Sequence, residues 1–299
     1  MTRPTPPVPA VLAAFAVVYL VWGSTYLAIR FAVETLPPFT MAGTRFVVAG
    51  ALLYAIVRLR GAAPPEAVHW RTAAIAGTLL LVGGIGATTW AIQRIPSGVA
   101  ALLVATLPMW MVLIDAARER AWPTASVAVG LGFGLAGVAV LIGPSELGSE
   151  PVDLVGAVAV VGATLSWSAG SVYQRGAEMA PDTLLNVAMQ MLVGGVLLTA
   201  LGLGLGERPV LDEASVRSVL SLAYLIVFGS LIAYSAYVWL LGVSTPAKVS
   251  TYAYVNPVVA VLLGWWLADE ALDARVVVAA VAVVTAVVLM TRRPRVAST

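Results

Sequence analysis

Residues Trp22–Phe39 read WGSTYLAIRFAVETLPPF and close the first long apolar run of the chain. A tryptophan, a tyrosine and the positive charge of Arg30 follow one another here at helical spacing. A helix that faces only lipid would avoid all three, because polar and charged groups are costly in hydrocarbon. We therefore expect a membrane helix with one face turned toward the protein interior. Arg30 is expected near the outer end of this helix, close to water and to the acid Glu34.

The composition of the whole chain supports a membrane protein. Of its 299 residues, 60% are hydrophobic and only 11% are charged, and the mean hydropathy is +0.95. Soluble domains are nearer one half apolar and about one quarter charged. The chain contains no cysteine, so disulfides, thiolate metal sites and thiol redox chemistry are excluded. The basic residues lie mostly in short loops and at the C-terminus, which indicates membrane orientation rather than nucleic-acid binding.

The chain divides into apolar ranges of membrane-spanning length. A helix needs about 20 residues to cross about 30 Å of hydrocarbon. Charged residues, prolines and glycines delimit ten such ranges: 10–32, 39–58, 71–92, 97–116, 124–142, 153–175, 183–203, 218–241, 247–267 and 274–291. We expect residues 1–142 to form a first unit of five helices, 143–152 a linker, and 153–299 a second unit of five. With both termini in the cytoplasm, eleven Lys and Arg lie on that side and five on the other, as the positive-inside rule predicts.

The two units resemble each other in sequence. Residues of the same type recur after 145 positions in the first two helices and after 149 in later ones: Trp22 and Trp167, Arg30 and Arg175, Gly50 and Gly195, Trp90 and Trp239, Pro108 and Pro257. Arg45 falls on Gln190, which is also polar. Because each unit has an odd number of helices, the second must enter the membrane inverted. Inverted repeats give a protein two mirror-related states, open to opposite sides, and they are typical of transporters.

A known family shows the same order of motifs. The chain has Trp22-Gly23-Ser24 followed by Arg30, then Gly43-Thr44-Arg45-Phe46, and later Pro108 and Pro257, each followed by an acidic residue and a further helix. Together with the duplication, this order resembles the EamA-type family of the drug/metabolite transporter superfamily over the whole chain. The resemblance implies an all-α membrane protein, with ten transmembrane helices as a 5+5 inverted repeat. It also implies export of metabolites or amino acids.

Polar and aromatic residues gather on six of the predicted helices, whereas ranges 124–142 and 274–291 are almost purely aliphatic and are predicted to be scaffold. We predict that the substrate path is lined by Trp22, Tyr26, Trp90, Trp110, Trp167, Ser171, Tyr234, Tyr237, Trp239, Lys248, Tyr252 and Asn256. For Trp90, Trp110 and Trp239 a place in the headgroup belt is an equal alternative. Serines and threonines rank below the aromatics, because their hydroxyls often bond their own helix.

The last three lining residues, Lys248, Tyr252 and Asn256, are spaced i, i+4, i+8 and would share one face of a helix. The lysine would either attract a substrate carboxylate or extend to the cytoplasmic headgroups.

A second group of residues is predicted to act in gating or structure. Arg30, Glu34 and Arg45 would lie together at the outer ends of the first two helices, since Glu34 is one turn after Arg30. Direct substrate binding by either arginine is the weaker alternative. Pro108 and Pro257 remove a backbone donor inside apolar helices and offer a place to bend.

The leading functional hypothesis is a secondary transporter that exports small amphipathic metabolites, with amino acids as the leading class and aromatic or hydrophobic ones within it. The alternatives are a multidrug or organic-cation exporter and a non-transporting membrane scaffold. We expect no catalytic residues, no cofactor and no metal. The Gly132–Gly137 stretch fits GxGxxG but lies inside an apolar helix, so it predicts close helix packing and not a dinucleotide site. The expected partners are a small-molecule substrate and the lipid bilayer, without nucleic acid, and a monomer suffices.

Overall fold

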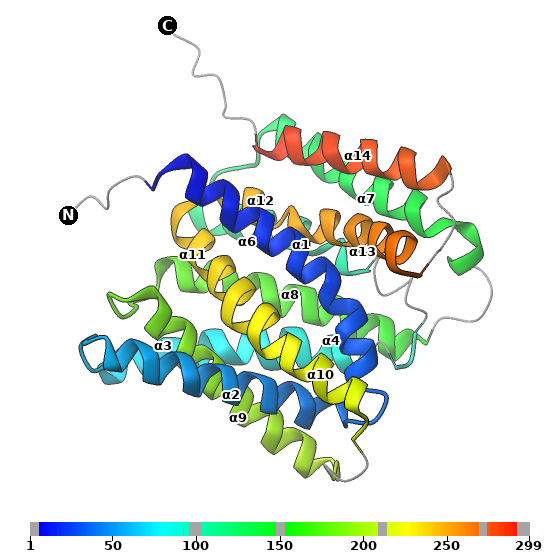
Figure 1. The fold of residues 1–299 in the computed structure, drawn as a ribbon. Helices are drawn as coiled ribbons and strands as arrows, with labels where there is room; N and C mark the ends of the chain where they lie inside the picture. Colours follow the sequence, from blue (N-terminus) through cyan, green and yellow to red (C-terminus); the bar gives the residue numbers. More distant parts are fainter. Residues whose placement is uncertain are drawn as a thin grey trace, which may run out of the picture.

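The computed structural model describes residues 6–91, 93–95, 103–147, 153–208, 214–268 and 274–291, and this part consists of helices and short loops (Figure 1). The range predicted as the first unit contains α1 (Val8–Ala32), α2 (Pro38–Leu59), α3 (Ala67–Gly77), η1 (Thr78–Gly86), α4 (Ala87–Ala91), α6 (Leu107–Glu119) and α7 (Ala125–Leu147). The second contains α8 (Leu154–Gly176), α9 (Thr183–Gly204), α10 (Val216–Tyr224), η3 (Leu225–Tyr234), α11 (Ser235–Val243), α12 (Pro246–Val249), α13 (Tyr252–Ala268) and α14 (Ala274–Thr291).

Helices occupy part of every range predicted from the sequence. Among the described residues, six continuous helices are long and apolar enough to cross a membrane: 8–29, 38–59, 67–91, 154–176, 183–204 and 216–243. Shorter apolar helices cover 125–140 and 277–291. The all-helical membrane fold is therefore confirmed, and the count of ten spans stays a prediction.

Local sequence sets the ends of these helices. Asp153 and Asp182 cap α8 and α9, each with a carboxylate that accepts from two backbone N–H groups of the first turn. At Asp153 the backbone N–H groups of Gly156 and Val155 hold the pKa below its ordinary value. Helices α2 and α9 are each followed by a glycine with positive φ, Gly61 at +88° and Gly206 at +87°. These two glycines are 145 residues apart, which is the offset of the sequence repeat.

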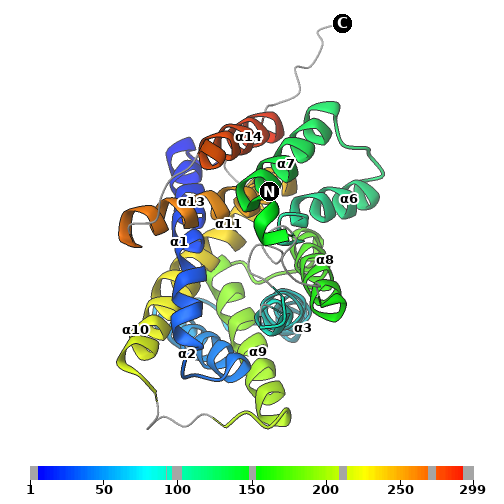
Figure 2. The same ribbon diagram turned by 90° about the vertical axis from the view of Figure 1, so that its right-hand side faces the viewer.

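Helices α2 and α9 pack closely along one side of the bundle, and both views show them side by side (Figures 1 and 2). Glycines make this approach possible. A Cβ on Gly43 would lie 2.9 Å from the carbonyl oxygen of Gly195, and one on Gly195 would lie 2.6 Å from the backbone nitrogen of Val47. A methyl group at either glycine would therefore push the backbones apart, as expected where small residues form a helix–helix contact in a membrane.

The two aliphatic helices α7 and α14 pack against each other on the opposite side of the bundle (Figure 2). Gly130 and Gly137 of α7 face Ala286 and Ala279 of α14, and the Ser126 hydroxyl donates to the Leu289 carbonyl at 2.7 Å. The predicted packing role of this glycine-rich stretch is thus confirmed at Gly137.

The remaining contacts occur in matching pairs. Helix α1 packs on the α10–η3–α11 helix and on α13, and α8 packs on the α3–η1–α4 helix and on α6. These are corresponding helices of the two predicted units. Both of the long partner helices contain a π-helical segment, η1 and η3. Such segments are often found at functional sites.

Candidate functional site

A cavity of about 160 Å³ lies inside the bundle between α1, the η1–α4 segment, α6, α8 and α13. Its wall is mainly apolar and includes the aromatic rings of Trp22, Trp167 and Tyr252. Polar groups in the wall come from threonines of α1, α4 and α8, from Asn256 of α13, and from Arg45 of α2. An apolar cavity with a few converging polar groups is the usual form of a small-molecule site.

One side of the cavity is closed by an aromatic cluster of Trp22, Trp167, Tyr237 and Tyr252. The Trp22 ring centroid lies 5.7 Å from Trp167, 5.0 Å from Tyr237 and 4.9 Å from Tyr252. Tyr237 lies 5.4 Å from Trp167 and 5.6 Å from Tyr252. The rings meet edge-to-face or tilted, the arrangements that aromatic quadrupoles favour, at about 0.5–1.5 kcal/mol a pair beyond their area.

Hydrogen bonds fix the rings of this cluster. The Trp167 indole Nε1 donates to the Tyr237 hydroxyl at 2.7 Å, and that hydroxyl lies 2.6 Å from Ser171 Oγ. Because Ser171 donates its proton to the Trp167 carbonyl at 2.7 Å, the Tyr237 hydroxyl is the donor to Ser171. The Trp22 indole donates to the carbonyl of Gly229 at 3.3 Å. The Asn256 amide, oriented by hydrogen bonding, donates to the carbonyls of Tyr252 and Tyr19 at 3.0 and 3.3 Å.

A second polar layer lies behind the aromatic cluster. The Tyr234 hydroxyl donates to Gln190 Oε1 at 2.8 Å, and Gln190 Nε2 donates to Gln174 Oε1 at 3.0 Å. Within the described part of the chain, Gln174 Nε2 is buried without an acceptor. Gln174 lies near the end of α8 and Gln190 near the start of α9, so these two layers separate the cavity from that end of the bundle.

The cavity extends toward the other end of the bundle, where α1 and α4 end and α8 begins. Ile29, Thr88 and Thr89 line it there. At the same end Arg94 pairs with Asp153 at 3.6 Å. This is the end predicted to face the periplasm.

Arg45 contributes the charge of the cavity wall. Its side chain is 4% exposed, its Nε donates to Ser230 Oγ at 2.7 Å, and its Cζ lies 4.8 Å from the Phe46 ring centroid. The sequence placed Arg45 in a gating network with Arg30 and Glu34, and the structure instead brings it to the cavity. Helix α2 carries it inward to the π-helical segment that contains Ser230.

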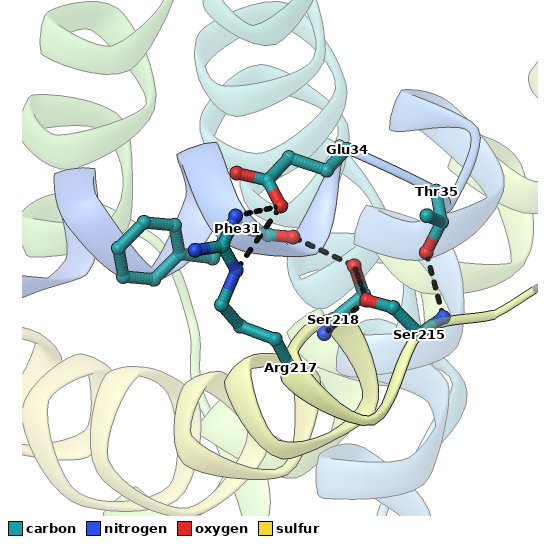
Figure 3. Close-up of polar contacts among 6 residues, drawn as sticks. All are labelled: Phe31, Glu34, Thr35, Ser215, Arg217 and Ser218. Carbon is teal, nitrogen blue, oxygen red and sulfur yellow. Dashed lines mark hydrogen bonds and ion pairs between the residues drawn. The ribbon is translucent and has the colours of Figure 1, made fainter.

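Glu34 has a different partner from the predicted one (Figure 3). It accepts from Arg217 of α10, with 3.1 Å between Arg217 Nε and Glu34 Oε2 and a second contact from Nη2. The expected contact of Glu34 with Arg45 is wrong, because Arg45 turns into the bundle while Glu34 faces solvent. The side chain of Arg30 lies outside the described part of the structure.

Further contacts join the end of α1 to the start of α10 (Figure 3). Arg217 Cζ lies 4.5 Å from the Phe31 ring centroid, the Ser218 hydroxyl donates to the Phe31 carbonyl at 2.7 Å, and Ser215 N–H donates to Thr35 Oγ1 at 3.1 Å. These contacts form a polar rim at the predicted periplasmic end.

Several predicted lining residues converge on the site. Trp22, Trp167, Tyr252 and Asn256 line the cavity. Ser171, Tyr234 and Tyr237 lie directly behind this wall through the hydrogen bonds and ring contacts described above. Of the predicted prolines, Pro108 is buried in the first turn of α6 and Pro257 lies inside α13. The side chain of Tyr26 lies outside the described part.

The other predicted lining residues lie elsewhere. Trp90 packs under Arg94, whose Cζ lies 4.3 Å from its ring, and Trp110 and Trp239 are partly buried outside the cavity wall. Lys248 is in the short helix α12, and a turn separates it from α13. The expected single helical face from Lys248 to Asn256 is therefore interrupted, and the lysine does not reach the cavity wall.

The sequence interpretation did not select Thr25 and Thr88, which also line the cavity. The Thr25 hydroxyl bonds the Trp22 carbonyl of its own helix at 2.7 Å, as serines and threonines in membrane helices often do. The signal that could have found it is its spacing, since Thr25 is three residues after Trp22 and shares its helical face.

A bundle of apolar helices around an aromatic and polar cavity is the architecture expected of a membrane transport protein. The family model of the EamA-like transporter family matches residues 9–143 and again 154–292. The inner membrane transporter YedA of Escherichia coli is 40% identical over 93% of this chain and 89% of its own length. PecM of Dickeya dadantii is 26% identical over 90% of this chain and 88% of its own length. A solved crystal structure, 23% identical, superposes with a TM-score of 0.78 over 95% of this chain and 97% of the other, which shows a shared fold.

The chain belongs to the EamA-like transporter family. It is a multi-pass inner-membrane protein of a family of transporters.

Proposed function

We propose that the protein exports small amphipathic metabolites, with amino acids as the leading substrate class and those with aromatic or other hydrophobic side chains within it. The observation that carries the proposal is the composition of the cavity. Trp22, Trp167 and Tyr252 offer apolar surface, threonines and Asn256 offer hydrogen bonds, and Arg45 supplies a positive charge. A solute with an apolar side chain and a compact polar end complements this wall.

The size of the cavity supports a small solute. Its volume of about 160 Å³ is below the range of about 300–1,000 Å³ that is usual for drug-sized ligands. A cavity of this volume favours a small solute over the larger cargo of a multidrug exporter.

We propose that transport occurs by alternating access between two inverted units of five helices, with both termini in the cytoplasm. The matched packing of α1 and α8, the π-helical segments in both long partner helices and the paired glycines Gly61 and Gly206 support this symmetry. The double match of the family model to 9–143 and 154–292 agrees with it. In this view the structure represents a state in which the cavity extends toward the periplasm and the aromatic cluster closes the cytoplasmic side.

An organic-cation exporter is the second candidate function. The aromatic rings around the cavity favour it, because the faces of Trp and Tyr attract ammonium groups. The guanidinium of Arg45 in the same wall opposes it, since like charges repel strongly where water is scarce.

Proteoliposomes loaded with unlabelled amino acids or organic cations test these proposals in a counterflow assay without ATP. We expect uptake of labelled hydrophobic amino acids above the rate of empty liposomes. Uptake of labelled cations alone would favour the second candidate. Rates equal to those of empty liposomes for every solute would favour the non-transporting scaffold and reject both.

A further inference from the structure

Among the described residues, the guanidinium of Arg45 has a hydrogen-bond partner at one of its three nitrogens. Nε donates to Ser230, and the two terminal nitrogens have no hydrogen-bond partner among the described residues. Only 4% of the residue's surface is exposed. The two terminal nitrogens nevertheless do not belong to the fully enclosed polar atoms that lack a hydrogen-bond partner. Because Arg45 lines the cavity, these terminal donors are exposed to the cavity and not sealed in protein.

No described carboxylate neutralises this charge. The ion pairs among the described side chains are Arg94 with Asp153 and Arg217 with Glu34, both at the surface of the bundle. An arginine inside a membrane protein normally pairs with an acid or with backbone carbonyls, because an isolated charge in low dielectric is costly. The wall therefore holds a positive charge whose natural counterpart is an anion in the cavity.

The surroundings of Arg45 hold the guanidinium in a defined orientation. Ser230 anchors Nε, and the Phe46 ring lies beside the group. Gly229 leaves room for it, since a Cβ at that position would lie only 2.6 Å from Nη2. A fixed planar fork of N–H donors matches the two oxygens of a carboxylate.

We infer that the terminal nitrogens of Arg45 form the subsite for the carboxylate of the transported solute. The apolar part of the solute then lies along Trp22 and Tyr252, which line the same cavity. This inference rests on the proposed function and deepens it. It assigns the recognition of the carboxylate to Arg45. A solute that has a carboxylate but no ammonium group should therefore bind, and a solute that has an ammonium group but no carboxylate should bind poorly.

Three solutes of similar size separate these features: L-phenylalanine, 3-phenylpropanoate, which has only the carboxylate, and phenethylamine, which has only the ammonium group. The purified protein is titrated with each, and binding is measured as the shift in the midpoint of thermal unfolding. We expect the two carboxylates to bind the unaltered protein at least about tenfold more tightly than phenethylamine, as a charge-assisted pair predicts.

Three variants test whether Arg45 causes the preference for carboxylates. Arg45→Gln removes the charge and keeps hydrogen bonding, and it should abolish the preference for carboxylates. Arg45→Lys keeps the charge without the planar fork and should retain part of it. Arg60→Gln removes an exposed arginine at the end of the same helix and should leave the preference unchanged. If Arg45→Gln does not fold, the partial loss of preference expected in Arg45→Lys tests the inference.

An unchanged carboxylate preference in the Arg45 variants would overturn the inference, as would tighter binding of phenethylamine than of 3-phenylpropanoate to the unaltered protein. The failure of the proposed function looks different. In that case no amino acid moves in the counterflow assay, whichever residue occupies position 45. Amino-acid transport that continues with the same selectivity in Arg45→Gln would reject the subsite alone.

Discussion

The substitution Gly229→Ala tests the geometry of the cavity wall without removing any functional group. Gly229 lies in η3 beside the guanidinium of Arg45. An added Cβ would lie 2.6 Å from Arg45 Nη2 and 3.3 Å from both Arg45 Cζ and Thr25 Cγ2. Non-bonded heavy atoms normally approach to about 3.5 Å, so the guanidinium must retreat by about 0.9 Å. Its Nε is tied to Ser230, so it cannot retreat without losing that hydrogen bond or its orientation.

The expected effect falls on transport and not on folding. A misplacement of about 1 Å of a positioned group can cost about a hundredfold in rate, and we expect the KM for L-phenylalanine to rise by about 10- to 100-fold. Alanine is favoured over glycine in a helix by about 0.8–1 kcal/mol, which offsets the steric cost. The midpoint of thermal unfolding in detergent is therefore expected to change little.

The assay is the initial rate of uptake into proteoliposomes as a function of substrate concentration. Gly162→Ala on α8 is the matched control, because a Cβ there would meet no atom within 4 Å. A KM equal to that of the unaltered protein, with normal folding, would refute the assignment of Arg45 to the substrate wall.

Three further outcomes are expected. Tyr237→Phe leaves the buried indole N–H of Trp167 without its acceptor and should lower the free energy of unfolding by about 0.6–1.7 kcal/mol. The measurement is the midpoint of thermal unfolding, which should fall. An unchanged midpoint would contradict the hydrogen-bond network described for the aromatic cluster. A single cysteine at Ser145 should be labelled from the periplasm, whereas one at Ser298 should be labelled only after the membrane is permeabilised. The reverse pattern would overturn the proposed topology. Tyr252→Ala should raise KM by about tenfold, whereas Lys248→Met, outside the cavity wall, should change it less; a larger effect at the lysine would return it to the substrate path.

The helical fold could be predicted because it depends on local composition and spacing. Apolar runs of membrane length gave the helices, and aliphatic composition alone indicated that α7 and α14 are scaffold, which their mutual packing supports. The sequence also placed Trp22 and Trp167, on helices far apart in the chain, in the wall of one substrate path, and their ring centroids lie 5.7 Å apart.

The parts that sequence reasoning missed depend on tertiary geometry. The pairing of Glu34 with Arg217 joins residues 183 positions apart, and an i, i+4 argument considers only neighbours on one helix. The break after Lys248 arises at Ser250 and Thr251, where the chain forms a turn between α12 and α13. The inward path of Arg45 depends on the space at Gly229, which no periodicity reveals.

The difference between Arg45 and Gln190 bears on how the two units could share one transport cycle. These residues are 145 positions apart, at the offset of the sequence repeat, and lie on α2 and α9, which pack along one side of the bundle. In this structure Arg45 lines the cavity, while Gln190 lies in the closed layer with Tyr234 and Gln174. If the units exchange roles, as an inverted repeat implies, the second state presents a neutral amide where the first presents a cation. A ligand shifts an equilibrium only by its difference in affinity for the two states. An anionic end on the solute would then favour the state that displays Arg45, whereas a solute without that charge would favour neither state through this pair of residues.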